Sequence, residues 1–256
     1  MLKEWVQYWT TPVRHPAARK MGYLYESIAL QARYQRCRAQ WQSHYALCRQ
    51  AITEAVADCQ RGRVLILGAG LLDDIPLAHL SDRFDEVCLL DLVWLRAARR
   101  AAKPFANVSC IEHDVTESLL PLLQGKRTVA TPTWGLDQGF SAVVSLNLVT
   151  QLPLLPARWL LRQQAAAAEI EHYAQELMRA HLAYLRQFDQ AHICLIADRC
   201  IQKRDATGRQ VDGIDPWWGL TPPPAQQAWW WEAVPLKEGG GYRRRHQVGV
   251  SFWRNG

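Results

Sequence analysis

The stretch Arg63-Val-Leu-Ile-Leu-Gly-Ala-Gly-Leu-Leu-Asp-Asp74 decides the fold of this chain. Its four apolar residues at 64–67 predict a short strand that is buried on both faces. Gly68-Ala69-Gly70 then predicts a tight turn, because the two glycines carry no β-carbon at its sharpest points. Such a turn between a strand and a helix lets a ligand approach the backbone and reach free N–H groups. A lone Gly-x-Gly is a weak signal, since such turns also occur in folds that bind nothing.

The segment after the turn, residues 71–80, is predicted to open a helix. Asp73 or Asp74 is its expected N-cap. The residues expected to face inward are Ile75, Leu77, Ala78 and Leu80.

The next buried run, residues 86–91, sharpens the interpretation because it ends on an acid, Asp91. This acid lies 21 residues after Gly70. An acid at the tip of the second strand, about 20 residues past the glycines, is placed to accept both hydroxyls of a ribose. The alternative is an ordinary solvated aspartate at a strand end.

Five further runs have the character of strands: 107–112, 140–147, 191–198, 229–236 and 246–253. The alternation of strands and helices over residues 63–147 indicates a parallel sheet with helices on both faces. The last two runs are joined by a glycine-rich segment at 238–242 and predict an antiparallel hairpin at the sheet edge.

The remaining segments predict helices and one long loop. Residues 1–20 read as an arm with some helix, and residues 21–60 as one long amphipathic helix or two in tandem. Residues 157–188 are predicted to be the longest helical run. Residues 202–228 are expected to form a long loop. The aromatic residues that could line a substrate pocket or pack in the core are Trp5, Trp9, Tyr23, Tyr25, Trp217 and Trp218.

Four segments carry a resemblance to the class I S-adenosylmethionine (SAM)-dependent methyltransferases: Val64–Gly70, Val87–Asp91, Ile111–Asp114 and Ala142–Asn147. The resemblance covers roughly residues 63–199. It implies an α/β fold with a Rossmann-like doubly wound sheet, mostly parallel, with a C-terminal antiparallel hairpin. It also implies a helical cap over residues 1–60, followed by a methyltransferase domain over residues 61–256.

The cofactor implied by this resemblance is SAM. In that family the glycine turn lies along the methionine and ribose part of the cofactor. The acid after strand two holds the ribose hydroxyls, an Asp after strand three faces the adenine, and the segment after strand four lines the methyl-transfer site. The cofactor-binding residues expected on this basis are Gly68, Ala69, Gly70, Asp91, Leu92, Asp114, Val115 and Asn147.

Two departures from the family pattern stand in the glycine stretch. An acid often precedes the first glycine by two residues, where this chain has Ile66, and the usual third glycine is Leu72. Either change is consistent with an altered subfamily or a weakened cofactor site. Asp73 or Asp74 either supplies the missing carboxylate or caps the following helix.

No catalytic residue follows from the sequence. Methyl transfer is an in-line displacement in which the protein mainly aligns the nucleophile and excludes water. If the nucleophile arrives protonated, His113, His246 or a tyrosine could act as general base, and the sequence does not choose among them.

Composition narrows the class of protein. The chain has 256 residues, 49% hydrophobic and 21% charged, which is typical of a soluble globular protein. It has no run of 18 apolar residues and no apolar segment at its start, so we expect no membrane span, no secretory signal and a cytoplasmic location. Seven cysteines without Cys-x-x-Cys spacing, and no His-Glu-x-x-His, predict buried thiols and no metal site.

The net charge of +6 is modest, with part of the basic excess in the first fifty residues and part in Arg243–Arg245. It could favour an anionic substrate or nucleic acid, but ordinary solvated surface is the favoured interpretation. No recognised nucleic-acid module is present. The oligomeric state cannot be read from the sequence.

The sequence therefore predicts a SAM-dependent methyltransferase that acts on a small-molecule substrate, with no nucleic acid as partner. An inactive methyltransferase-like protein that serves in binding or assembly is the first alternative, motivated by Ile66 and Leu72. A nicotinamide-dependent oxidoreductase is the second, and Asp73 at the place of its third glycine counts against it.

Overall fold

A single eight-stranded sheet forms the middle layer of the structure, a computed structural model that describes residues 2–256. The strand order is β3-β2-β1-β4-β5-β8-β7, and β6 pairs with β5 beside this path. The strands are β1 (Arg63–Leu67), β2 (Glu86–Asp91), β3 (Val108–Glu112), β4 (Phe140–Leu146), β5 (His192–Arg204), β6 (Gln210–Ile214), β7 (Gln227–Val234) and β8 (Arg243–Arg254).

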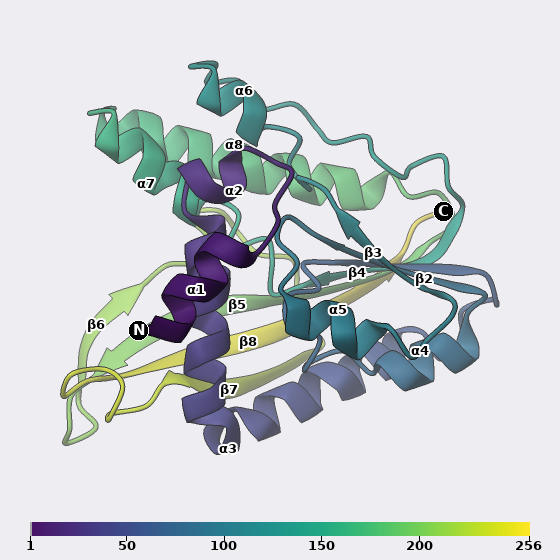
Figure 1. The fold of residues 1–256 in the computed structure, drawn as a ribbon, viewed down its shortest axis with the longest axis horizontal. Coiled ribbons are helices and arrows are strands. Elements are labelled where there is room, and N and C mark those ends of the chain that lie inside the picture. The colour runs from purple at the N-terminus through teal and green to yellow at the C-terminus, as the bar shows by residue number, and fades with distance from the viewer. Residues whose placement is uncertain (1) are drawn as a thin grey trace.

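Helices cover both faces of this sheet, as Figure 1 shows. One layer holds α6, α7 and α8, while α4, α5 and the second half of α3 lie on the other side (Figure 1). The helices are α1 (Leu2–Thr10), α2 (Ala17–Lys20), α3 (Tyr23–Ala55), α4 (Leu77–Arg83), α5 (Arg96–Ala102), α6 (Leu119–Leu123), α7 (Leu154–Arg162) and α8 (Ala167–Arg186).

Strands β1 to β5 run parallel, so their carboxyl ends meet at one edge of the sheet. The strand order reverses between β1 and β4, because β2 and β3 extend the sheet to one side and β4 and β5 extend it to the other. In doubly wound sheets this reversal point is where ligands bind, just outside the carboxyl ends. The predicted α/β class, Rossmann-like and mostly parallel, is confirmed.

The core has one half on each face of the sheet, because the four apolar residues of β1 alternate between the faces. Val64 and Ile66 pack with α3, α4 and α5, whereas Leu65 and Leu67 pack with α8. All four are fully buried, as the continuous apolar run predicts.

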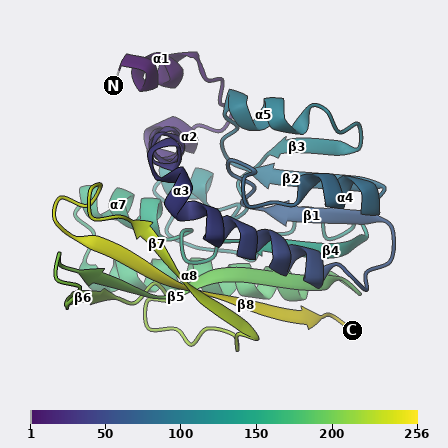
Figure 2. The same ribbon diagram turned by 90° about the horizontal axis from the view of Figure 1, so that it is seen from below.

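The antiparallel part of the sheet is larger than the predicted hairpin. β8 pairs with β7 on one side and with the whole length of β5 on the other. β5 runs on to Arg204, past its last pair with β4 at Ile196, and its far half pairs with β6. Figure 2 shows these strands reaching past the ends of β1, β2 and β3. The prediction of a long loop over residues 202–228 was therefore wrong where β6 and the end of β5 form.

The helices differ from the predictions in three places. Residues 71–76 form turns, and α4 begins only at Leu77, where Pro76 occupies the cap position without a side-chain hydrogen bond. The predicted caps, Asp73 and Asp74, were therefore wrong, and Ala78 is exposed. The predicted helix at 157–188 is two helices with a break at 163–166, and α3, with 33 residues, is longer than either.

The helices before β1 reach over the carboxyl edge of the sheet. Residues of α2 and of the first turns of α3 form a third apolar cluster with α6, α7, α8 and residues 92–95. The second half of α3, from Cys48 on, belongs to the core against the sheet. The division into a cap over residues 1–60 and a domain over residues 61–256 stays a prediction, and α3 spans both roles within a single helix.

Candidate functional site at the carboxyl edge of the sheet

The glycine turn lies at the reversal point, between the ends of β1, β2 and β4. The backbone N–H groups of Gly68 and Ala69 donate to the carbonyl oxygen of Leu90, which fastens the turn to β2. Gly68 has φ +78°, and a β-carbon there would lie 3.0 Å from the Leu146 carbonyl oxygen. Only glycine fits at this position, because both the backbone conformation and the close approach to β4 exclude a side chain.

Gly70 closes the same turn with φ +54°. Among the described residues, the nearest atom to a β-carbon at this position would be the Gly68 carbonyl oxygen, at 3.9 Å. The space above Gly70 is therefore open to a ligand.

The Asp91 side chain links the end of β2 to the glycine turn after β1. Its Oδ2 accepts a hydrogen bond of 2.8 Å from the Gly70 N–H, and its Oδ1 accepts one of 3.1 Å from the Val93 N–H. Burial raises the pKa of the Asp91 carboxyl, and the N–H groups of Gly70 and Val93 oppose that rise. Each carboxylate oxygen has acceptor capacity beyond the one bond it makes, which leaves the side chain able to bind a ligand hydroxyl.

Asp114 lies after β3 and is 6% exposed. Its Oδ1 accepts bonds from the N–H and the hydroxyl of Thr116, and its Oδ2 accepts one from the Leu119 N–H at 2.9 Å. Burial is the largest cause of the raised pKa values of Tyr23 and Tyr173, and the negative charge of Asp114 raises both pKa values further. The first turn of α3 and the middle of α8 therefore approach this loop from above.

The other expected contacts lie around these acids. Leu92 packs in the cluster beneath α2 and α3, and Val115 packs on the α8 side of the sheet. Asn147 follows β4 with φ +50°, and its N–H donates to the Ile196 carbonyl oxygen. Among residues 2–256, its side-chain oxygen is buried and has no hydrogen-bond partner.

Asp74 is the acid that the structure brings next to Asn147. Burial raises the pKa of the Asp74 carboxyl to about 7, the Asp73 carboxylate adds to this rise, and the Asn147 amide and Arg49 oppose it. The Asn147 amide also lies 4.0 Å from the Sγ of Cys48 on α3. Ile66, at the usual place of the acid, is fully buried in the core, so the carboxylate beside Asn147 is that of Asp74, from the segment after the turn.

Leu72 stands where the family pattern has its third glycine, and it has φ +70°. The backbone there adopts the left-handed conformation that glycine favours, although the residue is leucine. Its side chain is 6% exposed and packs in the core between the sheet and α3, α4 and α5, which offsets the conformational cost.

The candidate general bases lie apart from one another. His113 follows β3, its ring 5.5 Å from that of Trp134, and its Nε2 is 3.6 Å from Glu117. His246 lies on β8, where its Nδ1 is 2.9 Å from the Oδ2 of Asp198. The His113 N–H donates to the Asp91 carbonyl oxygen at 3.1 Å, so His113 lies beside the acid that holds the glycine turn, whereas His246 lies in the antiparallel part of the sheet.

The aromatic residues fall into two groups. Trp217 is 1% exposed and donates its indole N–H to the Asp198 carbonyl oxygen, so it is a core residue. Trp5, Trp9 and Tyr25 are between 63% and 65% exposed. Of the two alternatives for these three residues, packing in the core is wrong, and lining a substrate pocket stays a prediction.

Comparison with known proteins gives matches of fold only. No protein-family model matches the chain, and no curated protein is significantly similar to it in sequence. The DhpI–SAM–HEP complex is 14% identical, covers 92% of this chain and 99% of its own, and has a TM-score of 0.40. A Burkholderia thailandensis 1,6-didemethyltoxoflavin-N1-methyltransferase with S-adenosylhomocysteine is 15% identical, with 93% of each chain covered and a TM-score of 0.43.

A third match is the 23S rRNA methyltransferase ErmE, 11% identical over 78% of this chain and 68% of its own, with a TM-score of 0.33. At such identities and TM-scores these likenesses carry no argument about activity. The fold assignment rests on the strand order described above. Within residues 2–256 no helix has the length and apolar character that crossing a membrane requires.

Proposed function

We propose that this protein is a SAM-dependent methyltransferase acting on a small molecule. The observation that carries the proposal is the bond between the Gly70 N–H and the Asp91 carboxylate. It holds a left-handed glycine turn and a strand-end acid side by side at the point where the strand order reverses. A ribose that lies over this turn meets an acceptor for its hydroxyls and an open backbone.

The residues present fit this cofactor. Asp91 retains lone pairs for the ribose hydroxyls, and the space above Gly70 is open. The buried side-chain oxygen of Asn147 lacks a hydrogen-bond donor, and the ammonium group at the methionine end of the cofactor would supply one. Asp74 beside it replaces the acid missing at Ile66. We also assign Leu92, Asp114 and Val115 to contacts with the adenine of the cofactor. Ala69 would contact the cofactor from within the glycine turn.

When bound, SAM supplies a methyl group on a sulfonium that a nucleophile can displace in line. The part of this chain is then to hold the cofactor at Asp91 and Asn147, to align the acceptor, and to exclude water. The apolar cluster of α2, α3, α6, α7 and α8 above the carboxyl edge supplies the exclusion.

Calorimetric binding of S-adenosylhomocysteine, the product form of the cofactor, tests this proposal. The wild type should bind it and should not bind NAD. Gly70→Ala should weaken binding at least tenfold, because the new methyl group projects into the open space above the turn. Gly139→Ala is the matched control: its φ is +63°, a β-carbon there would meet nothing within 4 Å, and it precedes the amino end of β4.

The two variants pay a similar cost for a left-handed alanine, so a difference in binding reports on the ligand and not on stability. Binding of NAD in place of S-adenosylhomocysteine would refute the proposal. Failure to bind either cofactor would favour the alternative of an inactive protein with a binding or assembly role.

A further inference from the structure

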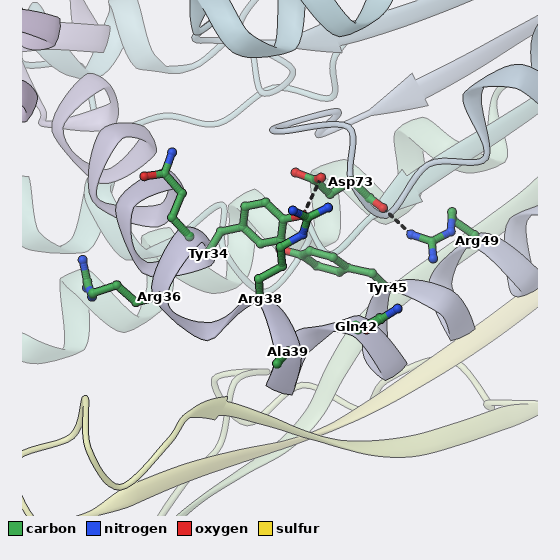
Figure 3. A pocket seen from close by; sticks show the side chains of 9 residues that line it. Tyr34, Arg36, Arg38, Ala39, Gln42, Tyr45, Arg49 and Asp73 are labelled. Atoms are coloured by element: carbon green, nitrogen blue, oxygen red, sulfur yellow. Dashed lines mark hydrogen bonds between the residues drawn. The ribbon is translucent and has the colours of Figure 1, made fainter.

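A hollow of about 640 Å³ opens along α3, beside the segment that follows the glycine turn (Figure 3). Its volume lies in the range of about 300–1,000 Å³ that small-molecule sites occupy. Nine residues line it: Tyr34, Gln35, Arg36, Arg38, Ala39, Gln42, Tyr45, Arg49 and Asp73.

One stripe of α3 supplies most of this lining. Tyr34, Arg38, Gln42, Tyr45 and Arg49 recur at intervals of three or four residues, which places them on one face of the helix. Asp73 forms the facing wall. It accepts a hydrogen bond of 2.8 Å from the Tyr34 hydroxyl, and its backbone carbonyl accepts one from Arg49.

The lining carries an excess of positive charge. Its three arginines face one carboxylate, Asp73. Arg36 is already neutralised, because Glu238 accepts two bonds of 2.8 Å from its guanidinium. Within residues 2–256 neither Arg38 nor Arg49 makes a salt bridge. Arg49 acts on the Asp74 carboxylate, whose pKa it lowers, without a contact of salt-bridge length. Two guanidinium groups without a salt bridge are matched to an anionic ligand.

Two aromatic rings lie on the same stripe as these arginines, with Tyr34 before Arg38 and Tyr45 between Arg38 and Arg49. The ring centroids of Tyr34 and Tyr45 are 5.5 Å apart, with an angle of 40° between the planes. Figure 3 shows both rings between α3 and the Asp73 segment, with the Arg38 side chain beside them. Tyr45 is buried and packs with Trp41 in a small core cluster, so the half-buried ring of Tyr34 is the aromatic face on which a planar ligand can stack.

We propose that this hollow binds an organic anion with a planar ring, whose carboxylate or phosphate is held by Arg38 and Arg49. The inference rests on the proposed function in one respect, which is that this anion is the methyl acceptor. Asp73 lies three residues after Gly70, so the segment that leaves the glycine turn also forms a wall of this hollow.

Titration of the full-length wild type with benzoate and with phenyl phosphate, followed by NMR, tests the site without the cofactor. Benzamide is the neutral comparison, and inorganic phosphate tests the anion without a ring. Benzoate or phenyl phosphate should bind at least tenfold more tightly than benzamide and inorganic phosphate. The tighter of the two anions identifies the acceptor's group as carboxylate or phosphate.

Arg38→Gln should weaken binding of that anion by about ten- to a hundredfold, the range of a charge-assisted hydrogen bond. Arg33→Gln is the matched control, since it removes the same charge from an exposed site on the same helix outside the lining. It should change the affinity less than twofold. Equal losses of affinity in Arg38→Gln and Arg33→Gln would mean that the anion responds only to the overall positive charge of the helix, which would overturn the proposal. Binding of benzamide as tight as that of benzoate would also overturn it.

Saturation with S-adenosylhomocysteine separates this inference from the proposed function. The anion should still bind when that ligand is present, because the two sites adjoin without overlapping. Competition between them would overturn the proposal of a separate site. A protein that binds the anions but no S-adenosylhomocysteine would keep the anion site and lose the methyltransferase, and with it the role of the anion as acceptor.

Discussion

Asp91 ends β2 and Asp114 follows the neighbouring strand β3, and a cofactor role is expected of both from the sequence, yet their carboxylates bind different groups in the structure. Asp91 accepts from Gly70, 21 residues away on another strand end, and keeps room for a ligand. Both carboxylate oxygens of Asp114 accept hydrogen bonds from Thr116 and Leu119, which lie within five residues of it. The first acid organises a site between segments, whereas the second organises its own loop.

The largest effect on cofactor binding should come from Asp91→Ala. A charge-assisted hydrogen bond contributes about 1.5–3 kcal/mol, so the variant should bind S-adenosylhomocysteine about ten- to a hundredfold more weakly. Asp91→Asn should lose less, since its amide oxygen still accepts one bond. Calorimetry on folded variants measures both. Asp85→Ala, which removes an exposed acid paired with Arg61, serves as control, and an affinity of Asp91→Ala equal to the wild type would remove the ribose assignment.

For Asp114→Ala, the loss in the free energy of unfolding should exceed the loss in the free energy of binding S-adenosylhomocysteine. The change leaves three buried donors without an acceptor, and such groups cost about 1–3 kcal/mol. Urea unfolding measures this loss. Asp114→Asn should retain part of the stability, because Oδ1 can still accept from Thr116. A hundredfold loss of affinity without loss of stability would show that the two acids are alike after all.

Asp74 extends the comparison to a third acid at the same edge. Its pKa is raised from 3.8 to about 7, so between these values the folded state holds a proton that the unfolded state releases. This contribution to stability is present at acid pH and declines as pH rises, by up to about 1.4 kcal/mol per unit, then levels off above pH 7.

Unfolding free energies of the wild type and Asp74→Asn, measured from pH 4 to 8, isolate this term, because the asparagine does not titrate. The wild type minus variant difference should fall toward pH 7. A difference that is flat over this range would mean that the carboxyl is solvated.

The smallest effect concerns Leu72, in the segment that Asp91 helps to hold. At φ +70° an alanine costs about 1 kcal/mol more than a glycine. Both substitutions remove the same buried side chain, so Leu72→Gly should be more stable than Leu72→Ala by about 1 kcal/mol. At negative φ the alanine variant is usually the more stable, so the expected order is reversed. Thermal unfolding of the two variants measures it. The usual order would indicate that the segment relaxes out of the left-handed conformation.

The sequence was most informative where structure is local. Residues 86–91 were predicted as a strand and form β2 over the same residues, because a run buried on both faces needs only neighbouring strands to hide it. It was least informative at β6, where all five residues are exposed. β6 forms because β5 continues beyond the end of β4 and its backbone there makes hydrogen bonds to β6. No pattern within residues 210–214 predicts this pairing.

The sequence by itself determined the parallel core, the glycine turn and the position of Asp91, since spacing along adjacent strands fixes which ends meet. Only the tertiary structure decided which acid stands beside Asn147, and that Trp217 lies in the core. It also decided that one stripe of α3 faces Asp73 and that Glu238 neutralises Arg36 from 202 residues away. These meetings depend on how a 33-residue helix crosses the sheet, and that angle follows from packing over the whole core.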